Sequence, residues 1–186
     1  MRLKTPREKR ILYVKTTVRW LLYILIILFS FVIMTSGSLK KPVLLVPVAL
    51  CIAVNSDIMV SAFTGAVCGF LIDIACGRLF GYNAVILTIF CVAATLIFEL
   101  YLRKKFFSFI MISAAASFLQ CWLDYKFFYD MWDYPDVERI FRNVTLKVWI
   151  YTVISSVIVF FIFKLINRLL MPREHLTIEE AIRSGD

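Results

Sequence analysis

The chain has 186 residues, of which 61% are hydrophobic and only 18% are charged. Its mean hydropathy of +0.84 is higher than a soluble domain of this size can bury in one core, so the composition excludes an ordinary soluble protein. At about 20 residues per transmembrane helix, the chain has room for about six spans and for little else. The composition therefore predicts an all-α, polytopic membrane protein.

The first predicted span is Val18–Thr35, which follows a basic segment, residues 1–17. A cleaved signal peptide has an apolar core of about 7 to 15 residues. The run here is longer, and further apolar runs follow it. We therefore expect an uncleaved first helix with residues 1–17 on the cytoplasmic side.

The second apolar stretch, Pro42–Val54, is the weakest of the predicted spans. About 13 residues cannot cross roughly 30 Å of hydrocarbon as a straight helix, and Pro47 interrupts the stretch. We expect a re-entrant or strongly tilted segment that continues through residues 55–57 into a third span, Ile58–Cys76.

Three further spans are predicted at Ala84–Leu102, Phe106–Leu123 and Val144–Asn167. The fifth contains a patch of small residues, Ser113–Ser117, where a neighbouring helix is expected to lie close. One transmembrane domain, 18–167, thus precedes a cytoplasmic tail, 168–186.

The basic residues predict the orientation, because cytoplasmic loops are enriched in Lys and Arg. With six spans, 14 of the 21 Lys and Arg residues fall on the side of the two chain ends. Both ends should therefore be cytoplasmic. The net charge of +8 is mainly this topology signal, with attraction to anionic membrane lipid as a by-product, and nucleic acid is not an expected partner.

Residues typical of catalytic or metal sites are scarce. The five cysteines lie in apolar spans without a C-x-x-C pair, which indicates small hydrophobic side chains, and the single histidine, His175, lies in the polar tail. No nucleophile elbow, phosphate-binding glycine loop or pair of carboxylates is present in the sequence. We expect no enzyme, no cofactor and no metal.

The third span carries an aspartate on a face of small residues. On a helix, Gly65, Gly69 and Asp73 fall on one face together with Ala62 and Cys76. Small residues at four-residue spacing allow two membrane helices to approach closely. The ridge therefore predicts that Asp73 lies in a protein contact.

Two interpretations of Asp73 remain open. A carboxylate inside a membrane is costly and by default suggests a functional role. Alternatively, Asp73 is hydrated near the outer interface, or bonds to the turn that follows. In that turn, Gly77 and Gly81 permit conformations closed to other residues, and Asn83 is expected to cap the fourth span. We expect Asp73 to fix this turn against a neighbouring helix.

At these positions the sequence resembles a known family. The residues that carry the resemblance are Gly65, Gly69, Asp73, Gly77, Gly81, Asn83 and Ala84, which follow a short apolar segment. Their spacing resembles the signature of the MreD family of rod shape-determining membrane proteins, and the similarity covers roughly residues 43–96. The first, fifth and sixth spans are similar only in layout, and the long connection between the last two departs from the family pattern.

The resemblance implies a non-enzymatic scaffold of the bacterial elongation machinery in the cytoplasmic membrane. Its implied partners are an MreC-like protein, MreB filaments, a RodA-type glycosyltransferase and a penicillin-binding transpeptidase. The family also resembles, in its six-helix fold, the substrate-binding subunits of energy-coupling-factor vitamin transporters, and such a subunit is the alternative function. Those subunits typically dock through alanines on the first helix. Because the first span here, "VRWLLYILIILFSFVIMT", has no alanine or glycine, the scaffold is favoured.

The predicted external connection, residues 124–143, is net acidic and rich in aromatic residues. It is interpreted either as an aromatic belt at the lipid headgroups or as a docking surface for the external part of a partner. The two interpretations are compatible. The candidate docking residues are Trp122, Phe127, Phe128, Tyr129, Trp132 and Tyr134.

Overall fold

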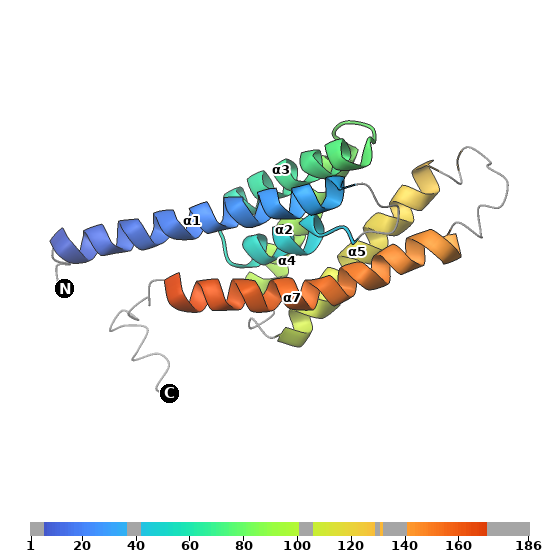
Figure 1. Cartoon of the computed structure of the whole chain (residues 1–186). Helices are drawn as coiled ribbons and strands as arrows, with labels where there is room; N and C mark the ends of the chain where they lie inside the picture. The colour runs from blue at the N-terminus through green and yellow to red at the C-terminus, as the bar shows by residue number, and fades with distance from the viewer. Residues whose placement is uncertain (1–5, 37–41, 101–105, 129–130, 132–140, 171–186) are drawn as a thin grey trace.

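The computed structural model describes residues 6–36, 42–100, 106–128, 131 and 141–170, and within them every regular element is helical. Figure 1 shows these helices as one elongated bundle. The elements are α1 (Pro6–Thr35), α2 (Leu45–Val54), α3 (Ile58–Cys76), α4 (Tyr82–Leu100), α5 (Phe106–Phe128), the π-helix η2 (Phe141–Thr145) and α7 (Leu146–Leu170).

Five helical segments among the described residues are long and apolar enough to cross a membrane. The bounds of α3 are those predicted from the sequence. The bounds of the other helices differ from the prediction, most of all because α1 already begins at Pro6 and α5 continues to Phe128. Residues 124–128, expected in the external connection, are therefore helical, and η2 adds a further turn before α7.

The second predicted span, Pro42–Val54, contains only a short helix, α2, in keeping with its expected shortness. α2 has ten residues, and at 1.5 Å per residue it covers about half of the hydrocarbon thickness. Nine of these residues are buried, so α2 is an internal helix surrounded by the others. Pro47 does not interrupt it. It lies in the first turn, where a backbone N–H would have no acceptor inside the helix.

The long helices form two close pairs around α2. α3 packs along α4, α5 packs along α7, and α1 lies against α2, α3 and α7. Direct contact between α4 and α5 is sparse. In Figure 1, the start of α1 and the end of α7 lie at one end of the bundle, and the turn between α3 and α4 lies at the other. We call these the terminal end and the turn end.

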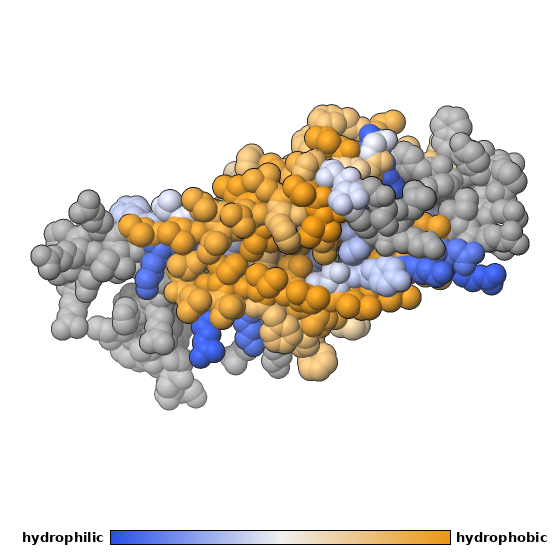
Figure 2. Space-filling model, viewed as in Figure 1, coloured by the Kyte–Doolittle hydropathy of each residue, from blue (hydrophilic) through white to orange (hydrophobic). Residues whose placement is uncertain are grey.

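The outer surface is apolar over most of its length. Figure 2 shows a broad hydrophobic band across the middle of the bundle, with hydrophilic residues towards its two ends. Exposed Leu, Ile and Phe side chains cover α1, α3 and α7 in this band. In water, a protein with such a surface would aggregate, whereas in a membrane the lipid chains cover the apolar side chains without a free-energy penalty. The length of the helices and their apolar outer surface therefore indicate a multi-pass membrane protein.

Candidate functional site

The glycines of α3 bring its backbone against that of α4. A Cβ atom on Gly69 would lie 2.3 Å from the Cα of Ala84, and one on Gly65 would lie 2.8 Å from the Cα of Thr88. Both distances are shorter than real Cβ contacts allow. The two helices can therefore pack this closely only with glycine at both positions, as at other membrane interfaces built from small residues.

α3 ends in a left-handed glycine. Gly77 has φ of 61° and ψ of 37°. The N–H of Arg78 donates to the carbonyl oxygen of Asp73 at 3.0 Å, and the N–H of Gly77 donates to that of Ile74 at 3.4 Å. This is the Schellman arrangement, which satisfies carbonyl groups that a helix end leaves without partners. It also turns the chain sharply back towards α4.

Asp73 holds the beginning of α4. One carboxylate oxygen, Oδ2, accepts the N–H of Gly81 at 2.8 Å. The other, Oδ1, accepts the backbone N–H of Asn83 at 3.1 Å and its side-chain Nδ2 at 2.8 Å. Asp73 is only 1% exposed. A carboxylate at a helix N-terminus is stabilised both by the free N–H groups and by the helix dipole.

Asn83 does not occupy the cap position that we expected. α4 begins at Tyr82, so Asn83 lies within its first turn, and the N–H groups at this helix end are bound by Asp73 from the preceding helix. The side chain of Asn83 instead connects two helices. Its Oδ1 accepts Nε2 of Gln120, on α5, at 2.8 Å.

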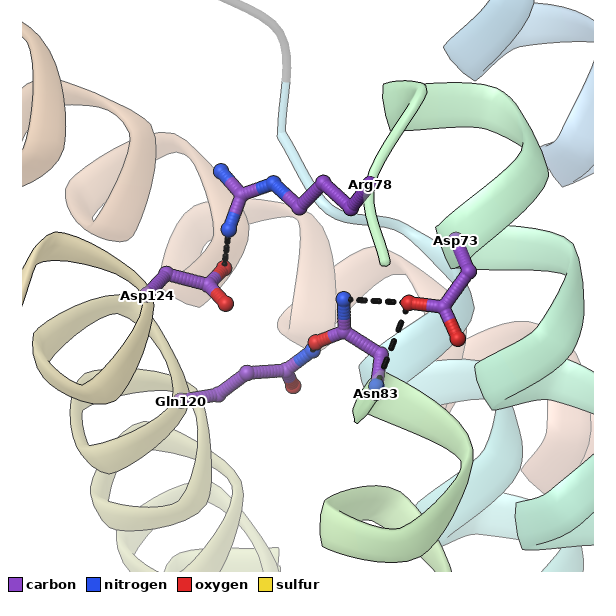
Figure 3. Close-up of polar contacts among 5 residues, drawn as sticks. All are labelled: Asp73, Arg78, Asn83, Gln120 and Asp124. Atoms are coloured by element: carbon purple, nitrogen blue, oxygen red, sulfur yellow. Dashed lines mark hydrogen bonds and ion pairs between the residues drawn. The ribbon is translucent and has the colours of Figure 1, made fainter. Parts of the chain in front are cut away.

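The network extends from Asn83 to α5, and a second contact reaches α5 from the turn. A guanidinium nitrogen of Arg78 lies 2.5 Å from Oδ2 of Asp124. Figure 3 shows how Asp73, Arg78, Asn83, Gln120 and Asp124 converge from α3, the turn, α4 and α5. Polar contacts thus bridge the seam at which α4 and α5 have little direct contact. We call these five residues the turn-end network.

Sequence reasoning missed the α5 half of this network. Asp124 was placed in an external connection, although it lies on α5, and Gln120 received no role. The available signal was their spacing, because residues four apart lie on one face of a helix. The spacing alone does not show which other helix this face of α5 contacts, because that depends on how the helices pack.

A second polar cluster fixes the two ends of α2. At its end, the carbonyl oxygen of Ala53 accepts the hydroxyls of Ser61 at 3.1 Å and Thr95 at 3.0 Å. At its start, the N–H of Val43 donates to the hydroxyl of Thr152 at 3.0 Å. Backbone groups inside a membrane need such internal partners, because the hydrocarbon offers none.

The aromatic candidates for docking are only partly described. Trp122 and Phe127 lie on α5 and are 40% and 43% exposed, and the ring of Phe127 packs against that of Tyr82 at 5.1 Å between centroids. Phe128 is the last residue of α5. Its side chain and the residues Tyr129, Trp132 and Tyr134 lie outside the described part of the chain.

One comparison with known proteins identifies the family. The family model for rod shape-determining protein MreD matches residues 14–169. No curated protein and no solved structure matches the chain, so the similarity to transporter subunits stays a prediction. Since the matched region covers most of α1 and α7 and all of the helices between them, with the turn-end network, the chain belongs to the MreD family, and its role is in determining the rod shape of the cell.

Proposed function

We propose that this protein is a non-enzymatic scaffold of the bacterial elongation machinery. In this role it binds an MreC-like protein and links MreB filaments to a RodA-type glycosyltransferase and a penicillin-binding transpeptidase. The observation that carries the proposal is the family match over residues 14–169. The turn-end network supports it, because the side chains that could do chemistry there already bond to one another across three helices.

We further propose that the terminal end faces the cytoplasm. The start of α1 and the end of α7 lie together at this end. If the chain crosses the membrane six times, two thirds of its Lys and Arg residues lie on this side. Cytoplasmic loops are enriched in Lys and Arg, so this side is expected to be cytoplasmic. The turn end would then face outwards, where the enzymes of wall synthesis act.

The exposed face of α1 is the proposed site for the membrane helix of a partner. Only 11% of the α1 span is buried inside the bundle, compared with 39% for α3 and for α4. The face includes Leu21, Leu28 and Val32, which are 54% to 61% exposed. A single-span protein such as MreC could pack along it without displacing any other helix of this chain.

A matched pair of substitutions tests this face. Leu28→Trp on α1 and Ile158→Trp on α7 both replace an exposed apolar side chain. Leu28 is 54% exposed and Ile158 is 60% exposed. If both positions face only lipid, both variants should behave as wild type. We expect only Leu28→Trp to reduce co-purification of the MreC-like protein from mild detergent and to impair rod shape in cells depleted of their own MreD protein.

The same experiment distinguishes the alternatives. Equal behaviour of the two variants would contradict docking on α1, although the scaffold role would survive if wall synthases still co-purify with the wild type. Recovery of paired ATPases with a coupling membrane protein would instead favour the transporter subunit. As a control, the wild-type copy must restore rod-shaped growth, which shows that the protein is active in the test cells.

A further inference from the structure

One face of α1 carries two basic side chains on its way out of the bundle. Lys15, Arg19 and Tyr23 are spaced four residues apart, so they lie on the same face of the helix. Tyr23 is only 1% exposed, Arg19 is half-buried and Lys15 is exposed. Other helices therefore cover this face at Tyr23, and they leave it progressively open towards the terminal end.

α7 covers this face at Tyr23 and ends beside Arg19. The hydroxyl of Tyr23 donates to Oδ1 of Asn167 at 2.6 Å, and its ring packs against that of Phe163 at 5.1 Å between centroids. α1 and α7 run in opposite directions (Figure 1). Arg19 lies four residues, about 6 Å, closer to the terminal end than Tyr23, and α7 ends three residues after Asn167, at Leu170. Arg19 is therefore level with the end of α7.

The guanidinium of Arg19 is held in place but has no counter-charge. Its Cζ lies 6.0 Å from the ring centroids of both Trp20 and Tyr23, within reach of a cation–π contact. Its Nε is buried and has no hydrogen-bond acceptor in the described structure. Among the described residues, no carboxylate forms an ion pair with Arg19 or Lys15. Two like charges four residues apart repel each other, so this face of α1 lacks an anion.

The length of α1 places these residues at the edge of the hydrocarbon. α1 has 30 residues and is about 45 Å long, whereas the hydrocarbon core is about 30 Å thick. A span that ends at Thr35 reaches back about 20 residues, to the turn of α1 that carries Lys15 and Arg19. Tryptophan, here Trp20, is enriched at this depth. The phosphate groups of the lipids lie next to this level, and long basic side chains extend towards them.

We propose that Arg19 and Lys15 bind the phosphate group of an anionic phospholipid at the edge of the α1–α7 seam. A guanidinium offers N–H donors in a plane that matches two phosphate oxygens, and the aromatic contacts keep this plane oriented. The ammonium of Lys15, one turn farther out, adds a second positive charge. Val18, the residue before Arg19, is 41% exposed, so an acyl chain can lie beside the site.

The charge of the site selects the headgroup. Two basic groups without a carboxylate favour a lipid of net negative charge, such as phosphatidylglycerol. Phosphatidylcholine carries its own ammonium group, which neutralises its phosphate. Inorganic phosphate offers the same oxygens but has no acyl chains to hold it at the membrane. This inference does not depend on the proposed scaffold role, because Leu28, on the face proposed for a partner, lies on the opposite side of α1 from Arg19.

Native mass spectrometry and thermal unfolding of the purified full-length protein test the site. Protein freed of lipid in a non-ionic detergent receives phosphatidylglycerol, phosphatidylcholine or inorganic phosphate at one ionic strength. We expect a saturable rise of the unfolding midpoint and a bound lipid with phosphatidylglycerol only. Equal midpoints with the two lipids would overturn the proposal, and so would a rise with inorganic phosphate alone. In the first case the headgroup charge is not recognised, and in the second the ligand is not a lipid.

A matched pair of arginines separates this site from general attraction to anionic lipid. Arg19→Gln and Arg168→Gln remove the same charge at the same end of the bundle. Arg168 is exposed and lies about 100° around α7 from Asn167, which faces α1. Arg19→Gln should need about 10 to 100 times more phosphatidylglycerol for the half-maximal shift, as for a lost hydrogen bond to a charged group. Arg168→Gln should need at most about five times more. Equal losses would refute the site.

A milder change covers the case in which Arg19→Gln disturbs the fold. Arg19→Lys keeps the positive charge but lacks the planar pair of donors. Its midpoint without lipid should equal that of the wild type, because Arg19 has no ion pair among the described residues to lose. We expect it to need about three to ten times more phosphatidylglycerol than the wild type. Binding as tight as in the wild type would contradict the contact that we assign to the guanidinium.

Discussion

Replacing Asp73 should weaken the fold more than any other single polar substitution at the turn end. Its carboxylate accepts three hydrogen bonds, at 2.8, 3.1 and 2.8 Å, from Gly81 and Asn83. Asp73→Leu leaves these donors in a buried position without an acceptor. An unsatisfied buried donor costs about 1–3 kcal/mol.

The total loss should be smaller than the sum of three such terms. The side-chain amide of Asn83 can turn towards another acceptor, and leucine avoids the cost of burying a charge. We therefore expect Asp73→Leu to lower the free energy of unfolding by about 3–5 kcal/mol. Asp73→Asn keeps one acceptor oxygen but turns an NH₂ group towards a donor. It should lose about 1–3 kcal/mol.

The assay is equilibrium unfolding in mixed detergent micelles, followed by circular dichroism. Both variants should still insert, because α3 stays apolar over its whole length. Asp57→Asn serves as the control and should stay within about 0.5 kcal/mol of the wild type. The reasoning would be refuted if Asp73→Leu matched the wild type within the same margin, because the three hydrogen bonds would then contribute nothing.

Further substitutions test the helix contacts. Gly69→Ala places a Cβ 2.3 Å from the backbone of α4 and should lower the unfolding midpoint strongly, whereas Gly77→Ala has free space around its Cβ. Its cost is confined to the left-handed backbone, about 1–2 kcal/mol. Thr152→Val removes the acceptor of the Val43 N–H and should cost about 1–3 kcal/mol in the same unfolding assay. Ser155→Ala is its control: Ser155 is half-buried on α7, its hydroxyl bonds to the carbonyl oxygen of Tyr151 in the same helix, and the change should be nearly neutral. The contacts described would be contradicted if Gly77→Ala cost more stability than Gly69→Ala, or if Ser155→Ala cost more than Thr152→Val.

The sequence by itself determined where the membrane segments lie. A run of apolar residues between polar ones is a local property, and its length is compared with a fixed bilayer thickness. This is why the bounds of α3 were predicted as observed and why Pro42–Val54 was recognised as too short. The spacing of the small residues and Asp73 between Gly65 and Ala84, together with the layout of the spans, indicated the family, which the match over residues 14–169 shows.

The sequence could not determine where α2 lies relative to the other helices. Its apolar residues are compatible with a tilted, re-entrant or internal helix, and only the surrounding helices make nine of its ten residues buried. The partners of its backbone ends, Thr152 and Ser61 with Thr95, come from three other helices. Nothing in the local pattern distinguishes these hydroxyls from those that only bond within their own helix turn.

Only the tertiary structure decided which polar groups of the turn end meet. Gln120 is 37 residues from Asn83 in the chain, yet their amides lie 2.8 Å apart. The sequence likewise gave no reason to pair Arg78 with Asp124 rather than with another of the acids near α5. A polar group buried in a membrane must find a partner, but which one it finds depends on the rotation and crossing of the helices that carry it. Those follow from close packing at positions such as Gly69, where two backbones touch.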